Sequence, residues 1–137
     1  MAKLNPYLTF NGSCKEAMNF YKDIFGGKLD IMLAGDSPAK DQMPSQYHNQ
    51  VLHSYLDSGK IQIMATDMMP EKFNEGNAVT LALTCESDEE TRSLFAKLSA
   101  GGKVTQPLHE AFFGLFGALT DRFGKYWLFQ FSNAPMR

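Results

Sequence analysis

Residues 4–29 read LNPYLTFNGSCKEAMNFYKDIFGGKL, and residues 79–104 read VTLALTCESDEETRSLFAKLSAGGKV. Aligned without a gap, the two stretches are offset by 75 residues, so the Gly-Gly-Lys run at 26–28 meets the run at 101–103. Two copies of one unit in a chain of 137 residues predict an internally duplicated domain, or two small halves sharing a core.

Each copy predicts a short strand followed by a helix. The strands are expected at about Tyr7–Phe10 and Val79–Cys85, where β-branched and aromatic residues are frequent. Residues 13–16 and 87–90 both match the capping box, in which a hydroxyl and a carboxylate three residues apart bind the free amides of a helix start. Both helices are expected to end at their Gly-Gly pair, because glycine readily adopts the left-handed turn after a helix.

Three further strands are expected after each helix. They are predicted at Lys28–Leu33, Val51–Leu56 and Lys60–Thr66 in the first half, and at Val104–Gln106, Leu115–Thr120 and Tyr126–Phe131 in the second. The fold class is therefore α+β, with a βαβββ repeat at about 4–67 and 79–131 and a linker at 68–78, in one domain spanning 1–137. The polar stretch 35–49, which the second copy lacks, is expected to form a surface loop rather than a lid.

Composition excludes several classes of protein. The chain has 13 basic and 15 acidic residues, a net charge of −2 and no basic cluster, which argues against nucleic acid or a membrane as a partner. Its two cysteines, Cys14 and Cys85, are not equivalent in the repeat, so we expect free thiols and a cytoplasmic protein rather than a disulfide scaffold. No signal peptide is visible, and no apolar run is long enough to span a bilayer.

Specific residues narrow the choice of α+β fold. They are the runs YLTFNG at 7–12, AMNFYKDIFGG at 17–27, MATD at 64–67 and TDRFG at 120–124, with His53, Phe113-Gly114, Phe116-Gly117 and Trp127. With these residues the chain resembles the PhnB-like branch of the vicinal oxygen chelate superfamily, which includes glyoxalase I, extradiol dioxygenases and bleomycin resistance proteins. The resemblance implies a curved mixed sheet that forms a cup, helices on the outer face, and a homodimer.

The resemblance also implies where a metal would bind. Metal-using members of the superfamily hold the ion with four His, Glu or Gln side chains from the first and last strands of the two modules. The corresponding positions here are Pro6, Ile63, Leu81 and Leu128, none of which offers a metal ligand. A shift of one residue gives Asn5, Gln62, Met64 and Thr80, which is also a poor set. We therefore predict no metal and no cofactor.

A polar site is the alternative. In the strand Val51–Leu56, alternation places His53 and Tyr55 on one face, with Leu52 and Leu56 on the side of the helix. PhnB-like proteins typically carry this histidine and an aspartate at the position of Asp67. His53 and Asp67 would form a general acid–base pair if they touch. The plainer alternatives are a histidine hydrogen-bonded within the sheet and an aspartate that starts a turn.

The remaining candidates are expected to contact a ligand in the cup. Phe113 and Phe116 lie in a glycine-flanked stretch that would wall a cup, fill a dimer interface or pack in the core, and His109-Glu110 are expected in a loop. By the repeat, Leu128 and Gln130 face the cup while Trp127 packs under the helix. The predicted ligand-binding residues are Tyr55, Ile63, Phe113, Phe116, Leu128 and Gln130.

Two main functions remain open at this stage. The first is the binding of a small, partly apolar molecule in a cup without the usual metal, as in bleomycin resistance proteins. The second is a metal-assisted lyase, isomerase or dioxygenase-like enzyme with a displaced site around His53 and Asp67. A scaffold with a vestigial cup is a third. Relatives of this chain often carry a ubiquinone methyltransferase name, but nothing in the sequence resembles an S-adenosylmethionine loop.

Overall fold

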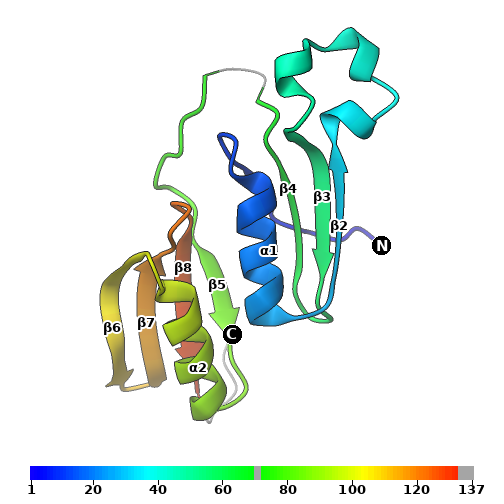
Figure 1. Ribbon diagram of the computed structural model, residues 1–137. Coiled ribbons are helices and arrows are strands. Elements are labelled where there is room, and N and C mark those ends of the chain that lie inside the picture. Colours follow the sequence, from blue (N-terminus) through cyan, green and yellow to red (C-terminus); the bar gives the residue numbers. More distant parts are fainter. Residues whose placement is uncertain (70–71, 133–137) are drawn as a thin grey trace. The chain divides into compact units, whose positions relative to one another are not determined.

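The computed structural model describes residues 1–69 and 72–132 (Figure 1). The chain divides into two compact units, Met1–Asn74 and Glu75–Arg137. Each unit contains one helix and a four-stranded mixed sheet, so the predicted α+β class and βαβββ repeat are confirmed. No helix in the described ranges has the length and apolar character needed to cross a membrane.

The first unit follows the order strand, helix, three strands. Its elements are β1 (Tyr7–Thr9), α1 (Cys14–Phe25), β2 (Lys28–Leu33), β3 (Val51–Asp57) and β4 (Gln62–Thr66). The strand order in the sheet is β1-β4-β3-β2, with β1 parallel to β4 and the other pairs antiparallel. The connection from β1 through α1 therefore returns the chain to the far edge of the same sheet.

The second unit repeats this topology. Its elements are β5 (Leu81–Thr84), α2 (Asp88–Ser99), β6 (Lys103–Ala111), β7 (Gly114–Thr120) and β8 (Tyr126–Phe131). The strand order is β5-β8-β7-β6, again with only the first pair parallel. β6 is much longer than predicted and includes His109 and Glu110, so the expected loop there is wrong. Pro107 masks the strand in the sequence, but β6 is an edge strand, where proline is tolerated.

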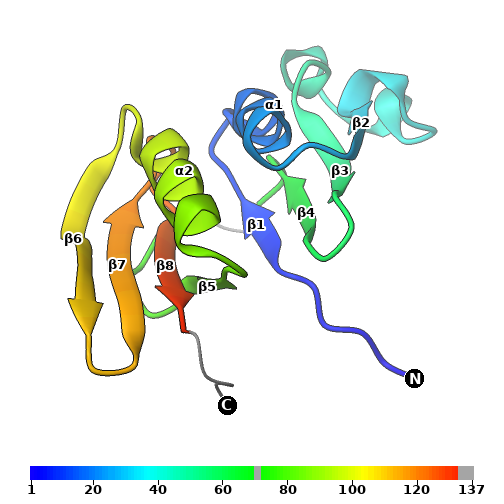
Figure 2. The same ribbon diagram turned by 90° about the horizontal axis from the view of Figure 1, so that it is seen from below.

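The core of the first unit lies between α1 and one face of its sheet, and Figure 2 shows the helix lying across that face. α1 buries Cys14, Ala17, Met18 and Tyr21. The Cys14 thiol is 3.6 Å from the hydroxyl of the buried Ser54 on β3. In the described residues α1 is the only α-helix of this unit.

The second unit is built in the same way. The Phe95 ring of α2 meets the Phe129 ring of β8 edge to face at a centroid distance of 5.3 Å. Gly117 makes room for this contact, because a Cβ at that position would lie 3.0 Å from the Phe95 ring. Trp127 is buried, as predicted, and its indole N–H donates to the Asp121 carboxylate at 2.8 Å.

The repeated Gly-Gly pair has a structural reason. In each unit the second glycine passes close to the end of the neighbouring strand, and an added Cβ would collide with a carbonyl oxygen. Gly27 meets the carbonyl of Asp57 at the end of β3, and Gly102 meets that of Thr120 at the end of β7. The equivalent close approach explains why both copies keep glycine here.

The two helices begin differently. At α2 the capping box is confirmed: the Ser87 hydroxyl accepts the amide of Glu90 at 3.0 Å, and the Glu90 carboxylate accepts the amide of Glu86 at 2.8 Å. At α1 the predicted box is wrong, because the Ser13 side chain makes no capping hydrogen bond. A distant residue, Asp67, takes its place (see below).

This difference predicts unequal effects of two matched substitutions. Ser87→Ala removes a hydrogen bond at a helix start and is expected to cost about 1 kcal/mol of unfolding free energy. Ser13→Ala removes no such bond, and its cost is expected to stay within about 0.5 kcal/mol. Urea unfolding followed by circular dichroism measures both values. Equal losses for the two variants would contradict the capping difference.

The polar stretch 35–49 forms a folded surface loop. It contains three 3-10 turns, at Ala34–Asp36, Lys40–Gln42 and Ser45–Tyr47. Ser37 is buried, and the Nε2 of His48 donates to the carbonyl oxygens of Lys40 and Met43, at 2.9 and 3.2 Å. His48 thus holds the turns of the loop together.

Candidate functional site

Each sheet has a helix face and an open face, which is the face opposite to its own helix. Cross-strand register and alternation define the open face of the first unit. Its members include Tyr7, Thr9, Met32, His53, Tyr55, Gln62 and Met64. His53 is exposed, and its ring stacks on that of Tyr7 with a centroid distance of 6.4 Å and an interplanar angle of 27°.

Asp67 lies on the helix side and is only 3% exposed. One carboxylate oxygen accepts the amides of Gly12 and Cys14, both at 3.0 Å, and the other accepts the amide of Val51 at 2.9 Å. The carboxylate therefore joins the start of α1 to β3 and to the end of β4. The Asp67 carboxylate thus accepts three backbone amides, whereas the acid–base hypothesis required it to accept a hydrogen bond from His53.

The structure does not bring His53 and Asp67 together. His53 is on the open face, whereas Asp67 continues the Ile63–Ala65 alternation that faces α1. In residues 1–69 and 72–132, no hydrogen bond or ion pair joins the two side chains. The hydrogen bond from His53 to Asp67 that would orient the imidazole as a general acid–base is therefore missing.

Ile63 was expected in the cup, but the structure places it under α1. It is 1% exposed and pairs with the buried Leu56. The reason is the length of the turns between the last two strands: four residues, 58–61, separate β3 from β4, and five residues, 121–125, separate β7 from β8. Aligning the turn glycines therefore shifted one strand by a residue, and such a shift reverses every side chain.

The same register places Leu81 on the helix side. Leu81 pairs with the buried Trp127, whereas Ala82 pairs with Leu128 on the open face. Of the four positions that the resemblance assigned to metal ligands, Ile63 and Leu81 thus face a helix, and Leu128 faces away from one. Pro6 lies just before β1, where its carbonyl accepts the amide of Met64 at 3.0 Å.

The open-face pairs at the corresponding level are Tyr7–Met64 and Ala82–Leu128. None of these four residues is a His, Cys, Asp or Glu. Nowhere in the described ranges do three such side chains gather closely enough to hold a metal ion. The side chains at the positions expected for metal ligands are therefore apolar, apart from the phenol of Tyr7.

The open face of the second unit carries several of the predicted ligand-binding residues. Its members include Ala82, Thr84, Phe116, Ala118, Tyr126, Leu128 and Gln130. The side-chain amide of Gln130 donates to the Thr84 hydroxyl at 2.9 Å. Leu128 and Gln130 therefore lie on the face that the repeat predicted, and their contact with a ligand stays a prediction.

A ladder of four rings follows the β6–β7 hairpin. Phe112 meets Phe113 at 5.2 Å, Phe113 meets Phe116 at 5.8 Å, and Phe116 meets His109 at 5.9 Å, all edge to face. His109 had been assigned to a loop. Its pairing with Phe116 across the hairpin is visible only once β6 is recognised as a strand through Ala111.

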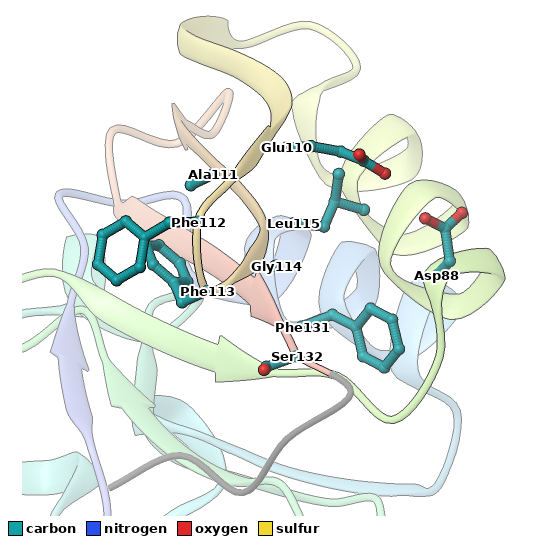
Figure 3. Close-up of a pocket in the computed structure, with 9 residues that line it drawn as sticks. All are labelled: Asp88, Glu110, Ala111, Phe112, Phe113, Gly114, Leu115, Phe131 and Ser132. Atoms are coloured by element: carbon teal, nitrogen blue, oxygen red, sulfur yellow. The ribbon is translucent and has the colours of Figure 1, made fainter.

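A hollow of about 530 Å³ lies at the end of this hairpin (Figure 3). We call it the hairpin hollow. Its lining residues are Asp88, Glu110, Ala111, Phe112, Phe113, Gly114, Leu115, Phe131 and Ser132. Carboxylates from α2 and β6 thus share one space with aromatic rings, and the sequence had suggested neither Asp88 nor Glu110 as a site residue.

Neither cysteine has the environment of a nucleophile. Cys14 is fully buried and Cys85 nearly so, and burial raises the pKa of the Cys85 thiol. We therefore expect the native protein to react with Ellman's reagent at neutral pH far more slowly than the urea-unfolded chain. In the unfolded chain both cysteine thiols should react. Rapid labelling of either thiol in the native state would contradict the burial.

Comparison with known proteins agrees with the fold and names the family. Residues 2–130 match the family described as 3-demethylubiquinone-9 3-methyltransferase. Protein YjdN of Escherichia coli is 30% identical over 135 residues, covering 91% of this chain and 92% of its own.

Solved structures agree as well. PA1353 from Pseudomonas aeruginosa is 34% identical, with a TM-score of 0.87 and coverage of 96% of this chain and 98% of its own. A putative 3-demethylubiquinone-9 3-methyltransferase, PhnB protein, from Bacillus cereus is 29% identical, with a TM-score of 0.76, and covers 96% and 100%. A glyoxylase/bleomycin resistance protein/dioxygenase domain from Frankia, at 17% identity and a TM-score of 0.59 over 99% and 95% of the two chains, shares the fold. The chain therefore belongs to the family described as 3-demethylubiquinone-9 3-methyltransferase.

Proposed function

We propose that this protein binds a small, partly apolar molecule on the open faces of its sheets, without the metal that many members of its superfamily chelate. The single observation that carries the proposal is the side-chain content of those faces. Where other members place metal ligands, the register of this chain supports Tyr7 beside Met64 and Ala82 beside Leu128. Such residues favour burial of an apolar ligand surface.

Polar groups on the same faces would orient the ligand. Tyr55 lies opposite Met64 in the first unit, with His53 two residues away on the same strand, and the Gln130–Thr84 pair lies next to Leu128 in the second. A few placed hydrogen-bonding groups within an apolar surface are typical of sites that select one ligand by orientation. In this proposal His53 is a ligand contact, since Asp67 is committed to backbone amides.

Ligand screening with a matched pair of variants tests the proposal. We expect thermal-shift screening of a metabolite and antibiotic library to give hits whose affinity falls at least about tenfold in Leu128→Asp, because a carboxylate would replace apolar contact. Leu4→Asp makes the same chemical change at an exposed position outside the sheets and should leave affinity unchanged. A library without any hit, or equal effects of the two variants, would contradict the proposal.

The donor set also predicts weak metal binding. Added Ni²⁺, Zn²⁺ or Mn²⁺ is expected to change the melting temperature little, because in the described residues no three His, Cys, Asp or Glu side chains gather to hold such an ion. Elemental analysis of the purified protein, together with calorimetric titration, measures this directly. One tightly held ion per chain would show that the site has been misplaced.

The methyl transfer implied by the family's description does not fit the residues present. In methyltransferases of the α/β type the methyl donor binds at the loop after the first strand. Here the segment after β1 leads into α1, and its amide donors, those of Gly12 and Cys14, are already bound by the Asp67 carboxylate. We therefore derive no reaction step from that description.

We further infer a homodimer, on the ground of the superfamily resemblance. The open face of the first sheet shows apolar side chains to water, with Tyr7 and Met32 both about half exposed. Light scattering coupled to size-exclusion chromatography measures the mass in solution. A mass of 15.3 kDa at all concentrations would contradict the inference.

A further inference from the structure

The hairpin hollow combines carboxylates with aromatic rings, a combination that the open-face ligand does not require. Asp88 comes from the first turn of α2 and Glu110 from the end of β6. Figure 3 shows the two carboxylates on the α2 side of the hairpin together with Leu115 and Phe131, and the rings of Phe112 and Phe113 on its other side. Two elements distant in sequence thus place negative charge beside an apolar surface.

The negative charge of the hollow is incompletely balanced. None of its described lining residues is cationic. Arg92 pairs with Asp88 at 2.6 Å, and the pKa of this guanidinium is raised first by the hydrogen bond and charge of Asp88 and then by the charge of Glu110. The Glu110 side chain makes no hydrogen bond or ion pair in the described part of the chain. One exposed cation therefore faces two carboxylates.

The N-terminus of α2 does not reverse this balance. Its partial positive charge is met by the Ser87 cap and by an acidic first turn, Asp88, Glu89 and Glu90. Glu90 is further engaged, because its carboxylate accepts the amide of Glu86. A cationic group entering the hollow therefore meets net negative charge.

The apolar part of the hollow is suited to an organic body. The Phe131 ring is only partly buried, and Figure 3 shows it on the same side of the hairpin as Asp88 and Glu110. Leu115 and Phe131 add aliphatic and aromatic surface on the side of the carboxylates. The volume of about 530 Å³ lies within the range of sites for small organic molecules. Aromatic faces also attract cations through the negative charge of the π system.

We propose that the hairpin hollow binds a small organic ammonium ion with an aromatic or aliphatic body. The ammonium group lies against Glu110, with Asp88 as the second carboxylate, and the body packs on Phe131 and Leu115. A neutral or anionic molecule of the same shape lacks the charge complementarity. Glu110 and Leu115 lie on the opposite face of the second sheet from Leu128, and the inference does not rest on the proposed function.

Titration with charge-matched probes tests the inference. 2-Phenylethylammonium and the neutral 2-phenylethanol have the same body and differ in charge. We expect the cation to bind roughly tenfold more tightly, with an affinity that falls as salt is added. Glu110→Gln is expected to lower the affinity for the cation to about that for the alcohol, and Phe131→Ala to weaken both probes. Nuclear magnetic resonance or calorimetric titration gives the affinities.

Two controls make the result specific. Glu89→Gln removes the same charge from an exposed side chain that does not line the hollow, and it should leave binding unchanged. Gln130→Ala alters the open face and should also leave binding of the cation unchanged, which separates this site from the proposed ligand site. Equal affinity for the cation and the alcohol would overturn the inference. So would equal effects of Glu89→Gln and Glu110→Gln, or no saturable binding of any probe, in variants with a native melting transition.

Discussion

Asp67→Ala is expected to lower the unfolding free energy of the first unit by about 3–5 kcal/mol, because it leaves three backbone amides without an acceptor in a buried position. The carboxylate holds Gly12, Cys14 and Val51 at 2.9–3.0 Å. Asp67→Asn keeps the shape and one acceptor oxygen, so its loss should be smaller. Urea unfolding measures both, and a loss for Asp67→Ala no greater than that for Ser87→Ala would contradict the expected role.

The two cysteines make the location of the damage measurable. Cys14 accompanies the Asp67 contact in the first unit, whereas Cys85 lies in the second. We expect Asp67→Ala to accelerate alkylation of Cys14 much more than that of Cys85. Asp57→Ala is the matched control, because this exposed carboxylate accepts hydrogen bonds from Gly59 and Gln62 within its own turn. Equal acceleration of both thiols would show that Asp67 does not act locally.

Phe129→Ala is expected to cost a similar amount, about 3–5 kcal/mol, in the second unit. Phe129 is 0% exposed, and its removal leaves a cavity against the Phe95 ring that the neighbouring strands cannot fill. Its effect should appear in the alkylation rate of Cys85, whose amide donates to the carbonyl of the next residue on β8, Gln130.

Phe112→Ala is the control for this truncation. The Phe112 ring is fully exposed, so its loss should change the unfolding free energy by no more than about 0.5 kcal/mol. A comparable loss for Phe112→Ala and Phe129→Ala would mean that the rings are not divided between surface and core as the structure has them.

The repeat made most of the fold predictable from sequence. The offset between residues 4–29 and 79–104 located both helices and the strands before them, and the regular alternation in β8 placed Trp127 under α2. These features depend on local pattern alone. The expected end of β6 was wrong because the strand contains a proline, which reads as a loop unless the strand is known to lie at an edge.

The site was less predictable, for two physical reasons. The turn between the last two strands is one residue longer in the second copy than in the first. Aligning the two copies therefore predicted the wrong face of the sheet for Ile63. Which groups a buried carboxylate binds also depends on residues that the tertiary fold brings near it. No local pattern shows that Asp67 reaches the amides of Gly12 and Cys14, more than 50 residues away.

The cap at Asp67 also has a consequence for folding during synthesis. The start of α2 receives its side-chain partners within a few residues, as soon as Glu90 follows Ser87, so that helix can be stabilised early. The start of α1 must wait until the ribosome has added residue 67, after every strand of the first sheet has been made. Closing such a long loop costs more entropy and slows folding. The N-terminal copy is therefore expected to stay loosely formed on the nascent chain for longer than its counterpart.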